Sequence, residues 1–501
     1  MSSFVIFAAN AALACAVRPN TVVVVGGGAA GFFGAITAAS SAESHLRVVL
    51  LEATPAILGK VRISGGGRCN VCHDDTKDRA VIASGYPRGE RTLLGSLSRF
   101  GATDATAWFR SRGVELKTEA DGRMFPVSDS SETIVRALSD AADEFGVEVQ
   151  RRAKVVRIQR CDGSDDSGGS HDRFEIVYQA PGASGAREEI SLRCRSLLVA
   201  TGGTRDGHQL LERDLGVPLV APVPSLFTLD LAPNGITEGL AGISVPDATV
   251  RLHWAADEDA TRVNDGDGSG QPDGSAGDAP TKNAPTTKKK RKRGGRGGGA
   301  TKFEASGPCL ITHKGLSGPA CLRLSAFAAR ELAAREYRGE LRVNWHPSHN
   351  EEQVLEACRG FASRSPKRGV VGYSPVGLPR RLWANLAASA GIEADTPWAA
   401  VSKAKMRALA QAVTSTTLRF VSKSTNKDEF VTAGGADLKA FSPKTFECKA
   451  TPGLYLAGEV LNVDGITGGY NFLNAWTTSW TAGSAIAADA DALSDSEPRE
   501  R

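Results

Sequence analysis

The sequence predicts an α/β fold in which the chain builds most of one domain, leaves it to form a second, and returns to complete the first. Residues 21–52 contain a strand, a glycine turn, a helix and a second strand, which is the order of a Rossmann-type βαβ unit. Residues 453–488 again contain an apolar strand, a glycine-rich turn and a small-residue helix. With 501 residues, the chain is long enough for two or three domains.

The composition is that of an ordinary soluble globular protein, with 41% hydrophobic and 23% charged residues. The net charge is +4, but residues 255–302 contain ten Lys or Arg and seven Asp or Glu. The rest of the chain is therefore close to neutral and has no face obviously built for nucleic acid. The nine cysteines are scattered, which argues against a disulfide framework and for a reducing compartment. No apolar run reaches the ~18 residues needed to span a bilayer.

The first twenty residues leave the localisation open. Phe4 to Ala16 is apolar, and Ala14-Cys15-Ala16 resembles a small-residue cleavage site. The positively charged start of a secretory leader is missing, however, because Arg18 is the sole charged residue in this stretch. Residues 1–20 are thus either a leader or an N-terminal extension, and the protein is expected to be cytoplasmic or organellar accordingly.

The N-terminal βαβ unit carries a dinucleotide-binding pattern. Its strand, helix and second strand are expected at Thr21–Val25, 29–42 and Leu46–Glu52. Gly26 allows the tight turn, Gly28 lets the backbone approach a pyrophosphate, and Gly31 lets the helix pack closely on the strand. Glu52 ends the second strand, where a carboxylate can accept ribose hydroxyls. The predicted cofactor-binding residues of this unit are Gly26, Gly28, Ala30, Gly31 and Glu52.

Three further features favour FAD over NAD as the dinucleotide. The apolar strand at 453–457 ends in Gly458 and Glu459, and flavoproteins commonly hold the ribityl chain at such a strand end through Asp. A glycine pair at 468–469 leads into the last helix, expected at Asn474–Ala488, and suits the negative edge of a reduced flavin. The strand at 197–200 also ends in glycines. The residues predicted to bind FAD from these segments are Thr201, Gly202, Gly203, Gly458, Glu459, Gly468, Gly469, Tyr470 and Asn471.

Five stretches in this order resemble the BaiN-like NAD(P)/FAD-dependent oxidoreductases, also described as aminoacetone-oxidase-like flavoproteins. They are ISGGGRCNV (63–71), DGRMFPVSD (121–129), THKGLSGPA (312–320), VTAGGADLKAFSPKTFECK (431–449) and GLYLAGEVLNVDGITGGYN (453–471). The resemblance covers residues 21–254 and 300–488. It implies a two-segment Rossmann-type FAD-binding domain, an inserted β-barrel-like domain and a small helical domain.

The domain boundaries expected on this basis follow the chain from end to end. Residues 21–204 and 416–490 form the FAD-binding domain, 205–345 the β-rich insertion and 346–415 the helical domain. A low-complexity stretch at 255–302 interrupts the insertion and is expected to be disordered. Residues 491–501 form an acidic tail.

The glycine loop after the second strand is expected to lie over the flavin. Its predicted FAD-binding residues are Gly65, Gly66, Gly67, Arg68 and Asn70. Where the family generally has CNxT, this chain has Cys69-Asn70-Val71-Cys72. Cys69 and Cys72 are either a dithiol that exchanges electrons with the flavin or a chance cysteine in place of threonine. No partner C-x-x-C exists, so we expect no metal site.

The resemblance implies a flavin-mediated reductase, with ketosteroid-type unsaturated compounds as the best-known substrate class. We expect NAD(P)H to reduce FAD transiently and the flavin to reduce a small unsaturated or carbonyl-type molecule, with Arg68 as anion stabiliser and Tyr470 as proton donor. One alternative is an amine oxidase that uses O₂. The other is an RNA-associated flavoprotein that docks through the basic residues 288–296; a solvated loop is the favoured interpretation of that run.

Overall fold

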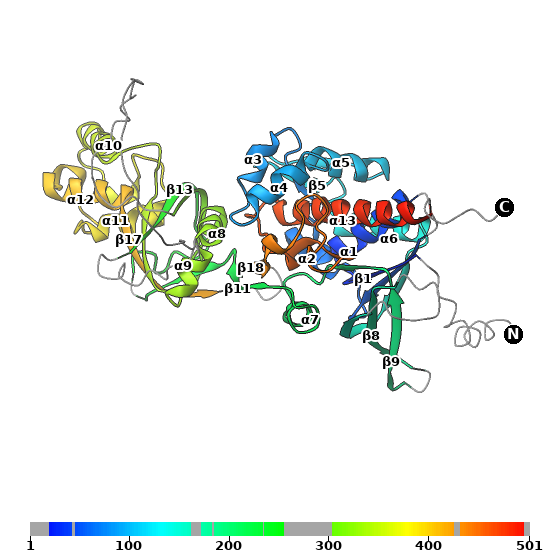
Figure 1. The fold of residues 1–501 in the computed structure, drawn as a ribbon. Coiled ribbons are helices and arrows are strands. Elements are labelled where there is room, and N and C mark those ends of the chain that lie inside the picture. Colours follow the sequence, from blue (N-terminus) through cyan, green and yellow to red (C-terminus); the bar gives the residue numbers. More distant parts are fainter. Residues whose placement is uncertain are drawn as a thin grey trace, which may run out of the picture.

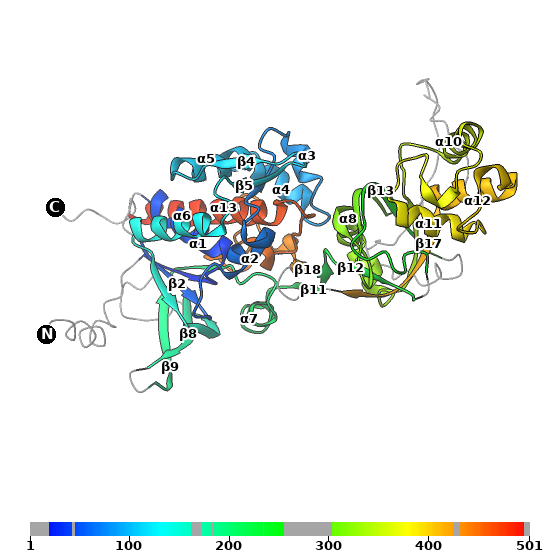
Figure 2. The same ribbon diagram turned by 180° about the vertical axis from the view of Figure 1, so that it is seen from behind.

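The computed structural model describes residues 20–42, 46–161, 172–182, 185–233, 235–254, 303–424 and 431–494. Two lobes stand side by side, a Rossmann-type lobe and a barrel lobe (Figures 1 and 2). Each has its own hydrophobic core. The low-complexity insert at 255–302 lies outside the described residues, as do residues 1–19 of the expected N-terminal extension and residues 495–501 of the expected acidic tail.

A five-stranded sheet with parallel neighbours is the centre of the Rossmann-type lobe. Its strands, in spatial order, are β19 (Leu454–Leu456), β10 (Ser196–Val199), β1 (Thr21–Val25), β2 (Arg47–Glu52) and β6 (Glu148–Arg151). Runs of Val and Leu form these strands because both faces of the sheet are covered, and Val23, Val24 and Leu50 are fully buried. The predicted βαβ unit is confirmed, with helix α1 at Ala29–Ser41.

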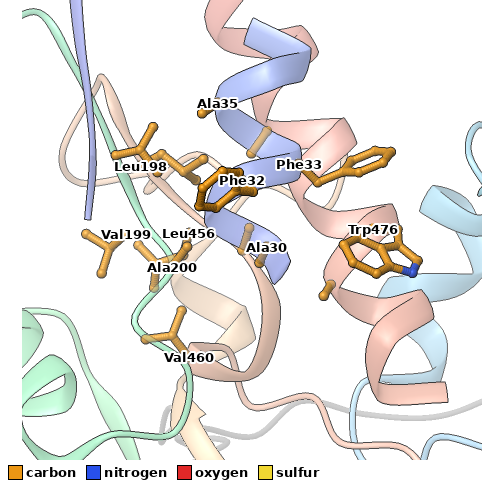
Figure 3. Close-up of a cluster of buried hydrophobic side chains, with 14 of the residues drawn as sticks. Ala30, Phe32, Phe33, Ala35, Leu198, Val199, Ala200, Leu456, Val460 and Trp476 are labelled. Carbon is orange, nitrogen blue, oxygen red and sulfur yellow. The ribbon is translucent and has the colours of Figure 1, made fainter. Parts of the chain in front are cut away.

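Helices α1 and α13 (Tyr470–Ser494) cross closely at two glycines. A Cβ added to Gly483 would lie 2.7 Å from the backbone oxygen of Gly34. Phe33 and Trp476 pack beside this crossing, with ring centroids 5.3 Å apart (Figure 3). The helix begins four residues before the expected Asn474, so that Tyr470 lies in its first turn.

The rest of the Rossmann-type lobe is built from short helices and two small antiparallel sheets. The helices are α2 (Gly59–Gly67), α3 (Arg79–Ala83), α4 (Glu90–Leu97), α5 (Ala102–Ser111), α6 (Ser131–Glu144) and α7 (Arg205–Leu215). One sheet has the order β3 (Cys72–His73), β5 (Arg123–Pro126) and β4 (Leu116–Thr118). The other has the order β7 (Lys154–Arg160), β8 (Phe174–Pro181) and β9 (Arg187–Cys194).

Six strands close into a barrel in the second lobe, which confirms the predicted barrel-like domain. Their order is β12 (Thr228–Leu231), β15 (Gly315–Ser317), β14 (Glu304–Ile311), β13 (Ser244–His253), β16 (Gly339–Asn344) and β17 (Thr416–Ser424). Strand β17 lies beyond the expected insertion at 205–345, in the stretch assigned to the second FAD-binding segment. Three helices, α10 (Glu351–Arg364), α11 (Arg380–Ser389) and α12 (Lys403–Thr414), lie on the side of the barrel away from the other lobe (Figure 1). Closure leaves no open sheet edge in the barrel.

Three helices lie in stretches that the sequence suggested were β-rich. Helix α7 forms because Thr204 caps it, accepting a hydrogen bond from the Gly207 amide at 3.2 Å. Helices α8 (Gly318–Phe327) and α9 (Ala329–Ala334) follow β15, and Pro319 lies in the first turn of α8, where proline is tolerated. Helix α8 contributes to both cores, because Leu324 is buried in the barrel core and Ala326 in the Rossmann-type core.

An antiparallel ribbon of β11 (Leu219–Ser225) and β18 (Val431–Ala436) carries the chain between the lobes (Figure 1). Gly435 lies directly against the backbone of Leu461, so the ribbon is fixed to the Rossmann-type lobe. Among the described residues, no helix is both long and apolar enough to cross a membrane.

The close crossing of α1 and α13 leads to a test with a matched control. Gly360 lies inside α10 with no atom within 4 Å of an added Cβ. We expect Gly360→Ala to raise the free energy of unfolding by about 0.5–1 kcal/mol, the usual gain for alanine in a helix. We expect Gly483→Ala to lower it by about 1–3 kcal/mol, because the added methyl group meets a backbone oxygen. Urea unfolding followed by circular dichroism measures both, and equal stabilisation by the two changes would show that the helices separate freely.

Candidate functional site

Parallel strands of the central sheet end at one edge and bring the predicted segments together. The turn after β1, Glu52 after β2, Thr201 after β10 and Gly458 after β19 all lie at this carboxyl edge. Backbone hydrogen bonds join neighbouring strand ends, from the Gly26 amide to the Leu51 oxygen and from the Ala200 amide to the Val25 oxygen, both at 2.9 Å. This edge is where open α/β sheets bind nucleotides.

The glycine turn after β1 has the shape that a pyrophosphate requires. Gly26 has a φ of +113° and lies against the backbone oxygen of Ala200. A Cβ on Gly31 would lie 1.8 Å from the Gly26 oxygen, so only glycine allows α1 to start this close to the turn. A Cβ on Gly28, by contrast, would meet nothing within 4 Å. The open side of the turn therefore faces a space beside the N-terminus of α1, as a phosphate site does.

Glu52 lies beside this turn and is held by the backbone. One of its carboxylate oxygens accepts a hydrogen bond from the Gly27 amide at 2.7 Å. The other accepts from both the amide and the hydroxyl of Thr54, each at 2.7 Å. A carboxylate oxygen can accept a further hydrogen bond, so this fixed group can take a ribose hydroxyl.

Glu459 connects the strand end after β19 to three other segments. Its carboxylate accepts a hydrogen bond from the Thr432 amide at 2.9 Å and pairs with the Lys60 ammonium at 2.7 Å. The same carboxylate lies next to the glycines at 202–203. Lys60 and Thr432 did not emerge from the sequence, although Lys60 stands just before the predicted glycine loop and adds a cation beside the phosphate turn.

The glycine loop at 65–67 is a left-handed backbone turn at the end of α2. Gly65, Gly66 and Gly67 all have positive φ, and the amides of Arg68 and Cys69 donate to the oxygen of Ser64. A Cβ on Gly66 would meet nothing within 4 Å, so this turn also borders free space. Three consecutive residues of this conformation require glycine.

Asn70 and Asn471 are both anchored by backbone groups. The Asn70 side chain accepts a hydrogen bond from the Met124 amide at 3.2 Å. Asn471 accepts from the Gly465 amide at 2.9 Å and donates to the Gly465 oxygen at 3.1 Å. Both asparagines therefore shape the loops of the site.

The loop at 464–469 reaches α13 through the predicted glycine pair. Gly468 and Gly469 have φ values of +114° and +94°. A Cβ on Gly469 would lie 2.2 Å from the Cys72 oxygen, so the loop packs directly on β3. The first amides of α13 have no partner within the helix and can serve an anionic flavin edge.

A buried ion pair fixes the start of this loop. The Asp464 side chain is fully buried and pairs with Arg88, and it accepts a hydrogen bond from the Ser225 hydroxyl at 3.0 Å. Arg88 also donates to the Ala326 oxygen of α8 at 2.7 Å. Burial raises the pKa of Asp464, and the Arg88 guanidinium opposes that rise. The pair thus joins the loop to the interlobe ribbon and to the barrel lobe.

Tyr470 lies in a polar cluster behind the glycine pair. Its ring packs on His73 at 4.6 Å between centroids and edge-on to Tyr86 at 5.6 Å. The His73 Nδ1–H donates to the Gly468 oxygen at 2.9 Å, and its Nε2 lies 3.2 Å from the Lys77 ammonium. Burial above all lowers the pKa of His73, and the Lys77 and Arg323 cations lower it further. His73 is therefore neutral at physiological pH.

Burial raises the pKa of Tyr470, while the Arg323 cation of α8 opposes the rise. The phenol is thus a neutral hydroxyl at physiological pH. No hydrogen bond from this hydroxyl is found within the described part of the chain. His73 and Arg323 were not predicted as partners of Tyr470, because their contacts with it join segments far apart in the chain.

Arg68 is less suited to the predicted role of anion stabiliser. Its guanidinium stacks on Phe125 at 3.9 Å and pairs with Glu119 at 2.7 Å and Asp129 at 3.4 Å. Two carboxylates already neutralise this charge, so Arg68 holds the glycine loop against its neighbours.

Cys69 and Cys72 are buried free thiols. Burial raises the pKa of each to about 12, whereas a reactive cysteine has a lowered pKa and some exposure. These surroundings favour packing roles and do not support the predicted redox pair.

The residues at this edge fit FAD. Besides the open space at Gly28 and Gly66, three buried side-chain oxygens near the strand ends and α13 lack a hydrogen-bond partner within the described part of the chain. They belong to Thr201, Asn462 and Asn474. Buried polar atoms are nearly always paired, so these acceptors indicate a bound polar group. The fold and the site together are those of an FAD-binding oxidoreductase.

Residues 20–485 match the family described as HI0933-like protein Rossmann domain, and the chain belongs to that family. The protein is thus an FAD-dependent oxidoreductase, as the sequence predicts.

Curated relatives cover nearly the whole chain at low identity. A ribosomal RNA dihydrouridine synthase of Haemophilus influenzae is 25% identical over 90% of this chain and 96% of its own length. A 3-dehydro-bile acid delta(4,6)-reductase of Clostridium scindens is also 25% identical, over 90% and 96%. A 3-ketosteroid-delta4-(5alpha)-dehydrogenase structure from Rhodococcus jostii RHA1 is 15% identical, with a TM-score of 0.44 over 94% of this chain and 98% of that one. Similarity at that score adds nothing to the assignment.

The open side of the glycine turn gives a direct test of FAD binding. We expect Gly28→Val to weaken FAD binding roughly a hundredfold, because the side chain occupies the space next to the turn without straining the apoprotein. Gly95→Val in α4 is the control, since its Cβ also meets nothing within 4 Å. Quenching of flavin fluorescence during titration of the apoprotein measures both. Unchanged FAD affinity in Gly28→Val would place the cofactor elsewhere.

Proposed function

We propose that this enzyme reduces a carbon–carbon double bond conjugated to a carbonyl group, with NAD(P)H as the source of hydride. The named activities of the two curated relatives support this reaction class. Making dihydrouridine saturates a double bond conjugated to a uracil carbonyl, and a delta(4,6)-reductase acts on double bonds conjugated to a 3-keto group. The common chemical element is an electron-poor C=C, whose reduction needs a hydride at one carbon and a proton at the other.

The position of Tyr470 is the observation that carries the proposal. Bound FAD would supply hydride chemistry, accepting a hydride from reduced nicotinamide and passing one to an electron-poor carbon. Tyr470 directly follows the glycine pair of the loop at 464–469, which we call the FAD loop. Its hydroxyl is neutral and makes no hydrogen bond within the described part of the chain. In our proposal this hydroxyl protonates the carbon next to the carbonyl group.

The groups around Tyr470 would prepare it for this role. His73 packs on the ring and holds the Gly468 oxygen, so it fixes both the acid and the loop before it. Arg323 comes from the barrel lobe and is cationic beside the phenol, where it would stabilise the phenolate left after proton transfer. The Tyr86 hydroxyl donates to the Tyr470 backbone oxygen at 2.7 Å and positions the first turn of α13.

Two substrate classes fit this chemistry. A small unsaturated carbonyl compound is the expectation from the sequence, and the bile acid reductase supports it. Uridine in RNA is the second candidate, and the ribosomal RNA dihydrouridine synthase of Haemophilus influenzae supports it. An amine oxidase would require the opposite direction of electron flow.

Anaerobic mixing with NADH or NADPH tests the direction. We expect rapid loss of the visible absorbance of oxidised flavin, followed by its return when a conjugated enone such as cyclohexenone is added. Stopped-flow spectroscopy measures both phases. Flavin that stays oxidised with both nucleotides, yet is bleached by an amine, would establish the oxidase instead.

The Tyr470→Phe variant tests the proton donor. We expect flavin reduction by NAD(P)H to be unchanged and reoxidation by enone to slow by about 10²–10⁴-fold, the usual contribution of a general acid. In the wild type, reoxidation should slow as pH rises through the raised pKa of Tyr470, because the phenol is then deprotonated. Tyr178→Phe in β8 is the control, since its phenol belongs to the β7–β9 sheet and not to the cluster around Tyr470. Equal slowing in the two variants, or a flat pH profile in the alkaline range, would remove Tyr470 from the mechanism.

A further inference from the structure

We propose that the helical side of the barrel lobe carries an RNA-docking surface, distinct from the flavin site. It consists of Phe361, Arg364, Lys367, Arg368 and Tyr373, which we call the Tyr373 platform. The inference rests on the proposed function in one respect: of its two substrate classes, small unsaturated carbonyl compounds and uridine in RNA, it selects RNA. It does not involve the basic insert, which lies outside the described residues.

An exposed aromatic ring is held flat at the centre of the platform. Tyr373 is 46% exposed, and its ring stacks on Phe361 with centroids 4.9 Å apart and planes at 17°. Behind Phe361 lies the buried Trp398, at 5.6 Å. Phe361 supports the Tyr373 ring, and the exposed Arg368 guanidinium lies over it. An unpaired base would stack on this ring beside the guanidinium, with little regard to sequence.

Basic side chains lie beside this ring. Residues 351–400 contain six Lys or Arg and five Asp or Glu, and three of the basic residues fall within five positions, at Arg364, Lys367 and Arg368. Arg368 lies 5.2 Å from the Tyr373 ring centroid, and Arg364 and Lys367 are exposed beside it in the chain. Among the described residues, Arg359 is the one cation of the six with an ion pair, 3.2 Å from Glu352. Arg364, Lys367 and Arg368 have no ion pair within the described part of the chain and can neutralise phosphates.

The segment that carries the platform is held in place by its backbone. The Trp383 indole donates to the Val370 oxygen at 2.9 Å. The amides of Trp398 and Ala399 donate to the oxygens of Arg368 and Pro366, at 3.0 and 2.9 Å. Because the loop is already ordered in the free protein, RNA binding does not carry the entropic cost of ordering it.

The location of the platform favours a polymer as its partner. Helices α10 and α11 lie on the side of the barrel away from the Rossmann-type lobe, whereas α8 faces that lobe (Figures 1 and 2). A small substrate at the flavin would not reach this side, but a large RNA could contact both. An acidic protein or an anionic membrane would use the charge but would not require a stacked, exposed ring.

The test measures binding of a fluorescein-labelled oligouridylate to the full-length holoenzyme by fluorescence anisotropy at several salt concentrations. For the Arg364→Gln/Lys367→Gln/Arg368→Gln variant we expect weaker binding. Each lost phosphate contact lowers the slope of log binding constant against log salt concentration by about 0.7, so the loss of three contacts should reduce the slope by about 2. For Tyr373→Ala we expect roughly tenfold weaker binding with an unchanged slope, because stacking is lost but no charge. Circular dichroism verifies that each variant is folded.

Matched controls separate this surface from general charge effects. Arg157→Gln/Arg160→Gln/Arg187→Gln removes three exposed cations from the β7–β9 sheet and should leave RNA affinity unchanged. Equal losses in the two triple variants would overturn the proposal. The proposal would also be overturned if RNA binding disappeared on deletion of residues 255–302 but survived in the platform variants. A third contrary result would be platform variants that keep RNA binding and lose only their binding to phosphatidylserine vesicles. Flavin bleaching by NAD(P)H in the wild type reports the proposed function separately, so either idea can fail without the other.

Discussion

The buried ion pair of Arg88 and Asp464 is the constraint on which the site depends. It is the point where the FAD loop, the interlobe ribbon and helix α8 meet, through Ser225 and Ala326. Burying such a pair adds little net stability, but removing one partner typically costs about 3–5 kcal/mol because the other charge is left alone. The pair therefore acts chiefly on the relative placement of the two lobes. Among the possible arrangements of the two cores, it favours the one in which Arg88 and Asp464 meet.

The same loop determines where the acid of the proposed reaction stands. Asp464 fixes the start of the loop, and Gly469 packs against the Cys72 backbone, so α13 has to begin at Tyr470. Further along α13, the Thr478 hydroxyl accepts from the Gly458 amide at 2.9 Å and donates to the Asn474 backbone oxygen at 2.6 Å. One helix thus anchors both the strand end of the FAD site and the phenol. Its many buried hydroxyls are satisfied within the helix or by neighbouring loops.

The sequence revealed the parts of the site that depend on local pattern. The βαβ unit, its glycines and Glu52 follow from spacing along a short stretch, and the structure places them at one sheet edge. Contacts over long separations were not accessible, such as Lys60 with Glu459, 399 residues apart, or His73 with Gly468, 395 apart. Spacing also suggested a role for Arg68 but could not reveal that Glu119 and Asp129 neutralise it. Helix α8 was missed for a similar reason, since its apolar residues serve two cores rather than one face.

Helix α8 also contacts both the barrel core beneath the Tyr373 platform and the residues around Tyr470. Its Leu324 belongs to the barrel core, which the helices carrying the Tyr373 platform also share through residues such as Leu355 and Trp383. Its Ala326 oxygen accepts from Arg88, and its Arg323 acts on Tyr470. A ligand held at the platform is therefore connected to the proposed acid by packed elements rather than by a flexible tether. Close-packed interiors transmit position over such distances, so remote docking of a large substrate would also set its place at the flavin.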